Sequence, residues 1–165
     1  MRRFAFALLV VVIALTAAAA DACASGYANA VLADNPQLSS FVVHDLNHQP
    51  RLPFDAASFD AVVCAVSVQY LIRPVEVFTD VRRVLRAGGH VVVSFSNRCF
   101  PTKAVAIWLA NDGGGHRRIV RTYLERSGFA EVRDQSVATS DDPLSVVSAR
   151  GPARDDARRV PVSTG

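Results

Sequence analysis

Two apolar runs separated by an amphipathic segment dominate the middle of the chain. The run from Phe59 to Val68, FDAVVCAVSV, is nearly continuous, which is typical of a central strand covered on both faces. Val91 to Phe95 is a second run that predicts another strand. Between them, Pro74 suits the first turn of a helix with apolar residues at spacings of three and four, namely Val75, Phe78, Val81 and Leu85. This succession predicts a parallel sheet with helices on both faces.

The pattern on either side of this unit predicts shorter elements. We expect Gly88-Gly89 to end the central helix through a left-handed cap, and Asp112 to Gly115 to form a flexible break. The other predicted helices are Tyr27–Asp34, Lys103–Ala110 and His116–Ser127. The other predicted strands are Phe41–His44, Phe129–Val137 and Leu144–Ala149. The last two strands are close enough in sequence to pair antiparallel at the sheet edge.

Residues 1–25 have the layout of a secretory signal peptide. Arg2 and Arg3 precede an uncharged stretch from Phe4 to Ala20, and residues 20–24 fit an A-x-A cleavage pattern. Without cleavage, residues 4–20 are long enough to contact a membrane or anchor the chain in it. The alternative is that Leu8 to Leu15, LLVVVIAL, forms a buried parallel strand of a cytoplasmic domain.

Composition narrows the class of protein. The chain has 165 residues, of which 50% are hydrophobic, enough for one globular domain. The formal charge of +3 is not concentrated in a basic helix, so we expect no nucleic-acid partner. The cysteines, Cys23, Cys64 and Cys99, lack a C-x-x-C spacing, which indicates neither a metal site nor a disulfide framework. Residues 151–165 are polar and predict a disordered tail.

One stretch of the sequence resembles a known family. Residues 44–97, HDLNHQPRLPFDAASFDAVVCAVSVQYLIRPVEVFTDVRRVLRAGGHVVVSFSN, combine an acid, Leu-Pro-Phe, a Ser-Phe-Asp entry to an apolar strand, and Arg-Val-Leu-Arg-Ala-Gly-Gly before the next strand. This pattern is similar to the second half of class I S-adenosylmethionine-dependent methyltransferases of the type 11 group. The resemblance covers residues 27–150 and implies an incomplete Rossmann-like α/β sheet, mostly parallel with an antiparallel C-terminal strand pair.

The resemblance implies a cofactor site at the carboxyl ends of two strands. Asp45 matches the acid that accepts a hydrogen bond from the adenine amino group of S-adenosylmethionine, and Leu46 matches the neighbour that borders the base. Ala65, Val66 and Ser67 match the segment near the methionine part of the cofactor. Open α/β sheets bind ligands at this edge. From the residues alone, Asp45 also suits a turn in which its carboxylate bonds the backbone two residues on.

The methyl acceptor is less defined. Gln69 and Tyr70 match the segment that lines the methyl-transfer site in the family, so we expect them to contact a small-molecule substrate. His44, His48 or Tyr70 could assist deprotonation of a hydroxyl acceptor. Nothing in the sequence selects among them, and the catalytic residues are unknown.

The glycine-rich turn that follows the first strand of such domains has no counterpart. Gly26 is the only glycine among the first 87 residues. The family's strand order, 3-2-1-4-5-7-6, would leave a gap of roughly 14 Å between the strand before Asp45 and the Phe59–Val68 strand. Three arrangements remain open: Phe41–His44 pairs with residues 62–66, the Leu8–Leu15 run substitutes for the first strand, or the domain is incomplete.

These observations lead to two hypotheses about function. The first is a truncated S-adenosylmethionine-dependent methyltransferase domain with weak or no activity, which the resemblance places in the cytoplasm. The second is an exported or membrane-anchored, non-enzymatic α/β binding module, which the signal-like start favours. An exposed sheet edge left by missing strands would also allow self-association.

Overall fold

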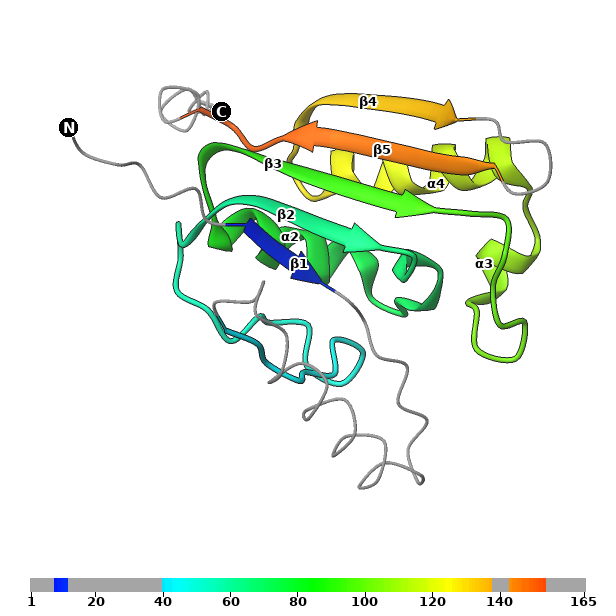
Figure 1. Ribbon diagram of the computed structural model, residues 1–165, viewed down its shortest axis with the longest axis horizontal. Helices are drawn as coiled ribbons and strands as arrows, with labels where there is room; N and C mark the ends of the chain where they lie inside the picture. The colour runs from blue at the N-terminus through cyan, green and yellow to red at the C-terminus, as the bar shows by residue number, and fades with distance from the viewer. Residues whose placement is uncertain (1–7, 12–39, 138–142, 154–165) are drawn as a thin grey trace, which may run out of the picture.

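The computed structural model describes residues 8–11, 40–137 and 143–153 (Figure 1). The strands are β1 (Leu8–Val11), β2 (Phe59–Ala65), β3 (Leu85–Phe95), β4 (Ala130–Val137) and β5 (Leu144–Arg150). The helices are the 3-10 turn η1 (Val68–Tyr70), α2 (Pro74–Val84), α3 (Ala106–Leu109) and α4 (Gly113–Arg126). The predicted helix Tyr27–Asp34 lies outside the described residues.

The five described strands form one sheet in the order β1-β2-β3-β5-β4. Neighbours β1, β2 and β3 are parallel, whereas β5 runs antiparallel to both β3 and β4. This order matches the last five positions of the expected 3-2-1-4-5-7-6 order, with β1 at the position of the first strand. The predicted α/β class, the parallel central strands and the antiparallel C-terminal pair are therefore confirmed.

The first strand comes from the apolar N-terminal run. Leu8 pairs with Ala61 and Val11 pairs with Cys64, in parallel register. Of the three arrangements left open by the sequence, this is the one in which LLVVVIAL substitutes for the first strand. No helix in the described residues is long and apolar enough to cross a bilayer. Cleavage of residues 1–25 stays a prediction.

The predicted strand Phe41–His44 is wrong. These residues are not in a strand, and the side chains of Phe41, Val42 and Val43 are 38%, 51% and 42% exposed. A β-branched sequence forms a stable strand only where a neighbour pairs with its N–H and C=O groups. In the described part of the chain, no strand lies between this segment and β1 to supply that pairing.

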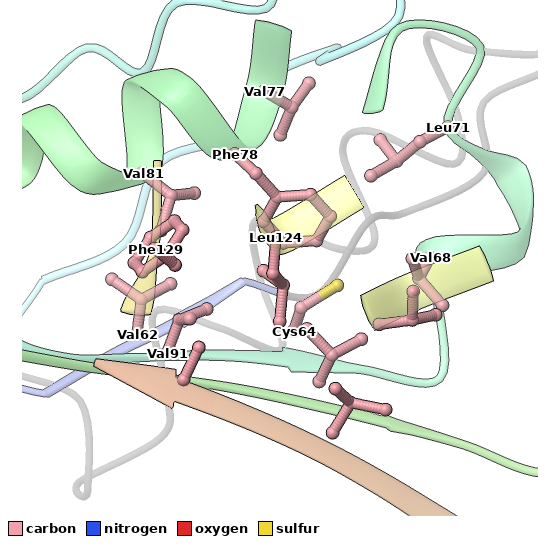
Figure 2. Close-up of a cluster of buried hydrophobic side chains, with 14 of the residues drawn as sticks. Val62, Cys64, Val68, Leu71, Val77, Phe78, Val81, Val91, Leu124 and Phe129 are labelled. Atoms are coloured by element: carbon pink, nitrogen blue, oxygen red, sulfur yellow. The ribbon is translucent and has the colours of Figure 1, made fainter. Parts of the chain in front are cut away.

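Helices α2 and α4 cover one face of the sheet (Figure 1). Figure 2 shows side chains of α2, among them Phe78 and Val81, pointing towards Val62 and Val91 of the sheet. These four side chains are at most 3% exposed. Alternate residues on the other face, such as Val92, are only half-buried, and no described helix packs there. The prediction of helices on both faces is thus met on one face within the described residues.

Several predicted boundaries need correction. The strand predicted for Phe59–Val68 ends at Ala65, and Val68 opens η1. Helix α2 ends at Val84, before Gly88-Gly89, which lie within β3; Gly88 is left-handed (φ 72°) but caps no helix. Residues 113–115 open α4 instead of forming a flexible break, because the Asp112 carboxylate accepts the Gly115 N–H at 3.0 Å as an N-cap. The helix predicted at Lys103–Ala110 is confined to α3, since residues 101–104 form turns.

The first residues of the predicted tail are attached to the sheet. The Gly151 N–H donates to the Gly89 carbonyl at 2.8 Å, and the Gly88 N–H donates to the Pro152 carbonyl at 3.2 Å. Residues 151–152 are therefore attached to the start of β3. The prediction for residues 154–165 falls outside the described residues.

Candidate functional site

The candidate site lies where β2 ends. Val66 follows β2 directly and has a φ of 48°, a left-handed conformation that is an outlier for a β-branched residue. Its N–H donates to the Ser94 carbonyl at 2.8 Å, which fixes it beside the end of β3. Such strain costs on the order of 1–3 kcal/mol and concentrates at functional sites. Figure 1 shows β2 and β3 ending on the same side of the sheet, near α3.

Asp45 forms the turn that the residues alone suggested. Its Oδ1 accepts the N–H of Asn47 at 2.9 Å and of His48 at 3.2 Å, and the Gln49 N–H donates to the Asp45 carbonyl at 2.9 Å. The carboxylate is exposed. A carboxylate has two oxygens and about four acceptor positions, so this turn leaves acceptor capacity for a ligand.

The Asn47 side chain joins this turn to η1 and the residues that follow it. Its Nδ2 donates to the Tyr70 carbonyl at 2.9 Å, and its Oδ1 accepts the Ile72 N–H at 2.9 Å. Arg73 adds two bonds, from Nη2 to the carbonyls of Asn47 at 3.0 Å and His48 at 2.8 Å. Asp45 and the segment after Val66 are thereby held together even though the strand predicted before Asp45 does not form.

The predicted cofactor residues differ in accessibility. The Leu46 side chain is 3% exposed and belongs to the core, so contact with a base is restricted to its backbone. Ser67 is 2% exposed and its Oγ lies 3.3 Å from the Cys64 Sγ. Ala65 is half-buried, whereas the Val66 side chain is 50% exposed. Among these residues, Asp45 and Val66 present side chains to a ligand; all the assigned roles stay predictions.

The two predicted substrate residues are both buried. Gln69 is 1% exposed and its Nε2 donates to the Val66 carbonyl at 3.2 Å. Tyr70 is 5% exposed, and its hydroxyl accepts the Phe100 N–H at 3.0 Å. Their side chains therefore hold the backbone of Val66 and Phe100 in place and do not line an open surface. Of the other candidate bases, His44 donates from Nε2 to the Gln49 carbonyl at 2.8 Å, and His48 is exposed.

A second set of bonds holds residues 52–54 against α2. The Arg83 guanidinium donates to the Leu52 carbonyl at 3.0 Å, to the Phe54 carbonyl at 2.8 Å and to both oxygens of Asp80. Asp80 also accepts the Leu52 N–H at 2.7 Å. Burial tends to raise the pKa of the Asp80 carboxyl, but the bonds from Arg83 and Leu52 outweigh it and hold that pKa below its ordinary value.

The sequence pattern did not identify four residues that anchor these loop segments: Asn47 and Arg73 at the Asp45 turn, and Asp80 and Arg83 at residues 52–54. Each acts through bonds to backbone groups more than twenty residues away. Periodicity reports which residues face a core, but it does not report such distant partners. Only Asn47 could have been identified from the sequence, because a side-chain amide next to a turn can both donate and accept hydrogen bonds.

Two further observations limit the chemistry. The described residues contain no group of three or more His, Cys, Asp or Glu side chains placed to hold a metal ion. A hollow of about 360 Å³, which we call the α2–β3 hollow, lies at the amino end of β3; its lining includes Arg82, Arg86 and Pro152. It is at the opposite end of β3 from Val66. We call the end of the sheet where Val66 follows β2, together with the Asp45 turn, the Val66 edge.

Cys64 is a core side chain. It is 4% exposed, and burial raises the pKa of its thiol to about 11, against a smaller lowering by its hydrogen bond with Ser67. The thiolate is the reactive form of cysteine, so this thiol is unreactive at neutral pH.

We therefore expect an alkylating reagent at pH 7.5 to modify Cys99, which is only half-buried, long before Cys64. Peptide mass spectrometry after timed labelling measures both sites. Addition of urea beyond the unfolding transition should bring Cys64 to the rate of Cys99. Equal rates in the native protein would contradict the packing of β2 against α2.

Comparisons with known proteins agree with the sheet order. A family model described as a methyltransferase domain matches residues 4–93, more than half of the chain, and this match includes β1. No curated protein matches the sequence.

Solved structures share the fold at low identity. A chain of the complex between the Haloferax volcanii Trm112 methyltransferase activator and the putative methyltransferase has a TM-score of 0.55 and 18% identity, covering 76% of this chain and 67% of that one. An Aquifex aeolicus S-adenosylmethionine-dependent methyltransferase has a TM-score of 0.53 and 16% identity, covering 78% and 61%. A Mesorhizobium loti S-adenosylmethionine-dependent methyltransferase has a TM-score of 0.51 and 20% identity, covering 75% of each chain.

The chain spans only part of the length of other matching structures, 56% of one and 36% of another. The family match and the shared fold nevertheless lead to one assignment. The chain belongs to the methyltransferase domain family, with a class I S-adenosylmethionine-dependent methyltransferase fold.

Proposed function

We propose that this chain is a methyltransferase-like protein that binds the S-adenosyl cofactor weakly at the Val66 edge and has weak or no transferase activity towards a small molecule. The observation that carries the proposal is the Asn47 bridge, which holds the Asp45 turn against Tyr70, the last residue of η1, and Ile72 beyond it. These bonds support the proposal because they link the Asp45 turn to the segment after β2 although the strand predicted before Asp45 does not form.

The adenosine end of the cofactor fits the described residues. The Asp45 carboxylate is exposed, its Oδ1 is oriented by two backbone N–H groups, and its remaining acceptor capacity suits the adenine amino group. Backbone groups of Leu46 would border the base. Because the turn is pre-formed, little conformational entropy is lost when the ligand binds.

The methionine end of the cofactor has less support. In the family, a glycine-rich turn after the first strand lets the backbone approach the cofactor closely. Here β1 ends at Val11, and Gly26 is the only glycine before Gly88. By the family resemblance, Ala65, Val66 and Ser67 would border this part of the ligand. We therefore propose a dissociation constant in the high micromolar to millimolar range, on the order of −4 to −6 kcal/mol.

The transfer chemistry itself would come from the cofactor. When bound, S-adenosylmethionine supplies a methyl group activated by a sulfonium centre, so that the protein contributes mainly orientation. Gln69 and Tyr70 are buried beside Val66 and shape the acceptor side through their bonds to Val66 and Phe100. His48 is the exposed candidate for accepting a proton from an acceptor hydroxyl.

Calorimetric titration of the purified full chain with S-adenosylhomocysteine tests the proposal. We expect saturable binding at high micromolar to millimolar ligand and a matching rise in Tm, because a ligand that binds only the folded state stabilises it. Adenosine should retain part of the affinity, while methionine alone should show none. Absence of both heat and thermal stabilisation at 5 mM, about five times the weakest dissociation constant proposed, would exclude the proposed cofactor site.

A further inference from the structure

We infer that Gln69 is a positioning residue that holds the strained backbone of Val66 at the ligand edge. The resemblance assigns Gln69 a contact with substrate, but its side chain is 1% exposed and folded back towards the protein. Its Nε2 donates to the Val66 carbonyl at 3.2 Å. The expected effect of Gln69 on ligand affinity rests on the proposed function, because the ligand is proposed to bind at this edge.

The orientation of the Gln69 amide follows from its partner. A carbonyl oxygen can only accept a hydrogen bond, so the nitrogen of Gln69, and not its oxygen, must face Val66. The Oε1 atom is then directed elsewhere, and within the described residues it is buried without a hydrogen-bond partner. Leaving a buried acceptor unpaired is unfavourable, so Gln69 does not serve stability well.

Both polar backbone groups of Val66 are bonded, which explains how its conformation persists. The N–H donates to Ser94 and the carbonyl accepts from Gln69. A left-handed backbone is unfavourable for valine, so these two bonds have to oppose relaxation to an extended chain. Gln69 itself is fixed by the Val105 N–H, which donates to the Gln69 carbonyl at 3.0 Å. Strain and an unpaired buried oxygen at one place indicate a site shaped for a ligand at the expense of stability.

The test compares Gln69→Met, a substitution of similar volume that removes the donor, with the wild type. NMR reads the Val66 conformation directly, because the NOE between an amide proton and its own Hα is strong when φ is positive. We expect this NOE to be strong in the wild type and to weaken in the variant. The variant loses the hydrogen bond to Val66, but it also loses the unpaired buried Oε1 atom, and these two effects oppose each other. We therefore expect Tm to fall by less than about 4 °C.

The effect of the substitution on ligand binding is measured as the affinity for S-adenosylhomocysteine. We expect a loss of about tenfold or more in Gln69→Met, but no further loss when the same substitution is made in a Val66→Gly background, because glycine adopts positive φ without support. Ser127→Ala is the control: it removes a buried hydroxyl that donates to the Val75 carbonyl at 3.1 Å. It should lower Tm without changing the Val66 NOE.

A strong Val66 NOE that persists in Gln69→Met would overturn the inference, as would a large fall in Tm with unchanged affinity. If the wild type binds no ligand, the proposed function fails. The NOE comparison then still decides whether Gln69 holds Val66.

Discussion

Asp45→Asn is expected to reduce affinity for S-adenosylhomocysteine by about tenfold to a hundredfold while leaving Tm nearly unchanged. Asparagine keeps an oxygen that can accept the N–H groups of Asn47 and His48, so the turn survives. What it presents to the adenine amino group is then a donor in place of an acceptor. Loss of a hydrogen bond to a charged group is typically worth about 1.5–3 kcal/mol. Calorimetry and thermal denaturation of the same samples measure both quantities.

Asp45→Ala provides the comparison, because it removes the turn and the proposed ligand contact together. We expect a loss of affinity at least as large, now with a lower Tm. If both variants bound the ligand as well as the wild type, Asp45 would be a turn former alone, the simpler role that its sequence also allows.

Arg83→Met should destabilise the fold strongly, because Arg83 attaches residues 52–54 to α2. It leaves the carbonyls of Leu52 and Phe54 and the Asp80 carboxylate without their shared donor. The Asp80 side chain is only 14% exposed, so water replaces these bonds incompletely. We expect a loss of about 2–4 kcal/mol in the free energy of unfolding, measured by urea denaturation.

Arg121→Met is the matched control, since Arg121 bonds two exposed acids, Glu125 at 3.5 Å and Asp134 at 2.6 Å. Exposed pairs of this kind contribute about 0–1 kcal/mol. An equal loss in the two variants would contradict the role of Arg83 as the attachment of residues 52–54 to α2.

The Asp80–Arg83 ion pair also predicts how the stability of the fold depends on pH in acid. The pKa of Asp80 in the folded protein is lowered from its ordinary value of 3.8. A lowered folded pKa means that the ionised carboxylate stabilises the fold above pH 3.8 and that this contribution disappears as pH falls through the folded pKa. Urea denaturation below pH 4 should therefore show a steeper loss of stability in the wild type than in Arg83→Met.

The local hydrophobic pattern was sufficient to predict the elements at the centre of the fold. The β2, α2 and β3 elements follow from apolar periodicity, because each buries one repeating set of residues such as Phe78 and Val91. The Asp112–Gly115 segment failed as a predicted break because a single side chain, Asp112, caps a helix that three glycines alone would not start.

The candidate site depended on partners distant in the sequence. Phe41–His44 has the composition of a strand, but strand formation requires a neighbour that the described chain does not supply. The Asp45 turn is nevertheless held against η1 and the start of α2 through Asn47 and Arg73, whose bonds to distant backbone groups leave no local signal. Strain at Val66 is likewise set by the ends of β2 and β3 and not by its own residue type.

The central claim is that an S-adenosyl ligand binds at the edge formed by the Asp45 turn and Val66. Titration of the isotopically labelled full chain with S-adenosylhomocysteine to 5 mM, followed by amide chemical shifts, locates the ligand directly. The account predicts saturable shifts that are largest at Asp45, Asn47, Val66 and Ser67. It is contradicted if no amide shifts, or if the shifts gather around Arg82 and Arg86 in the α2–β3 hollow at the other end of the sheet.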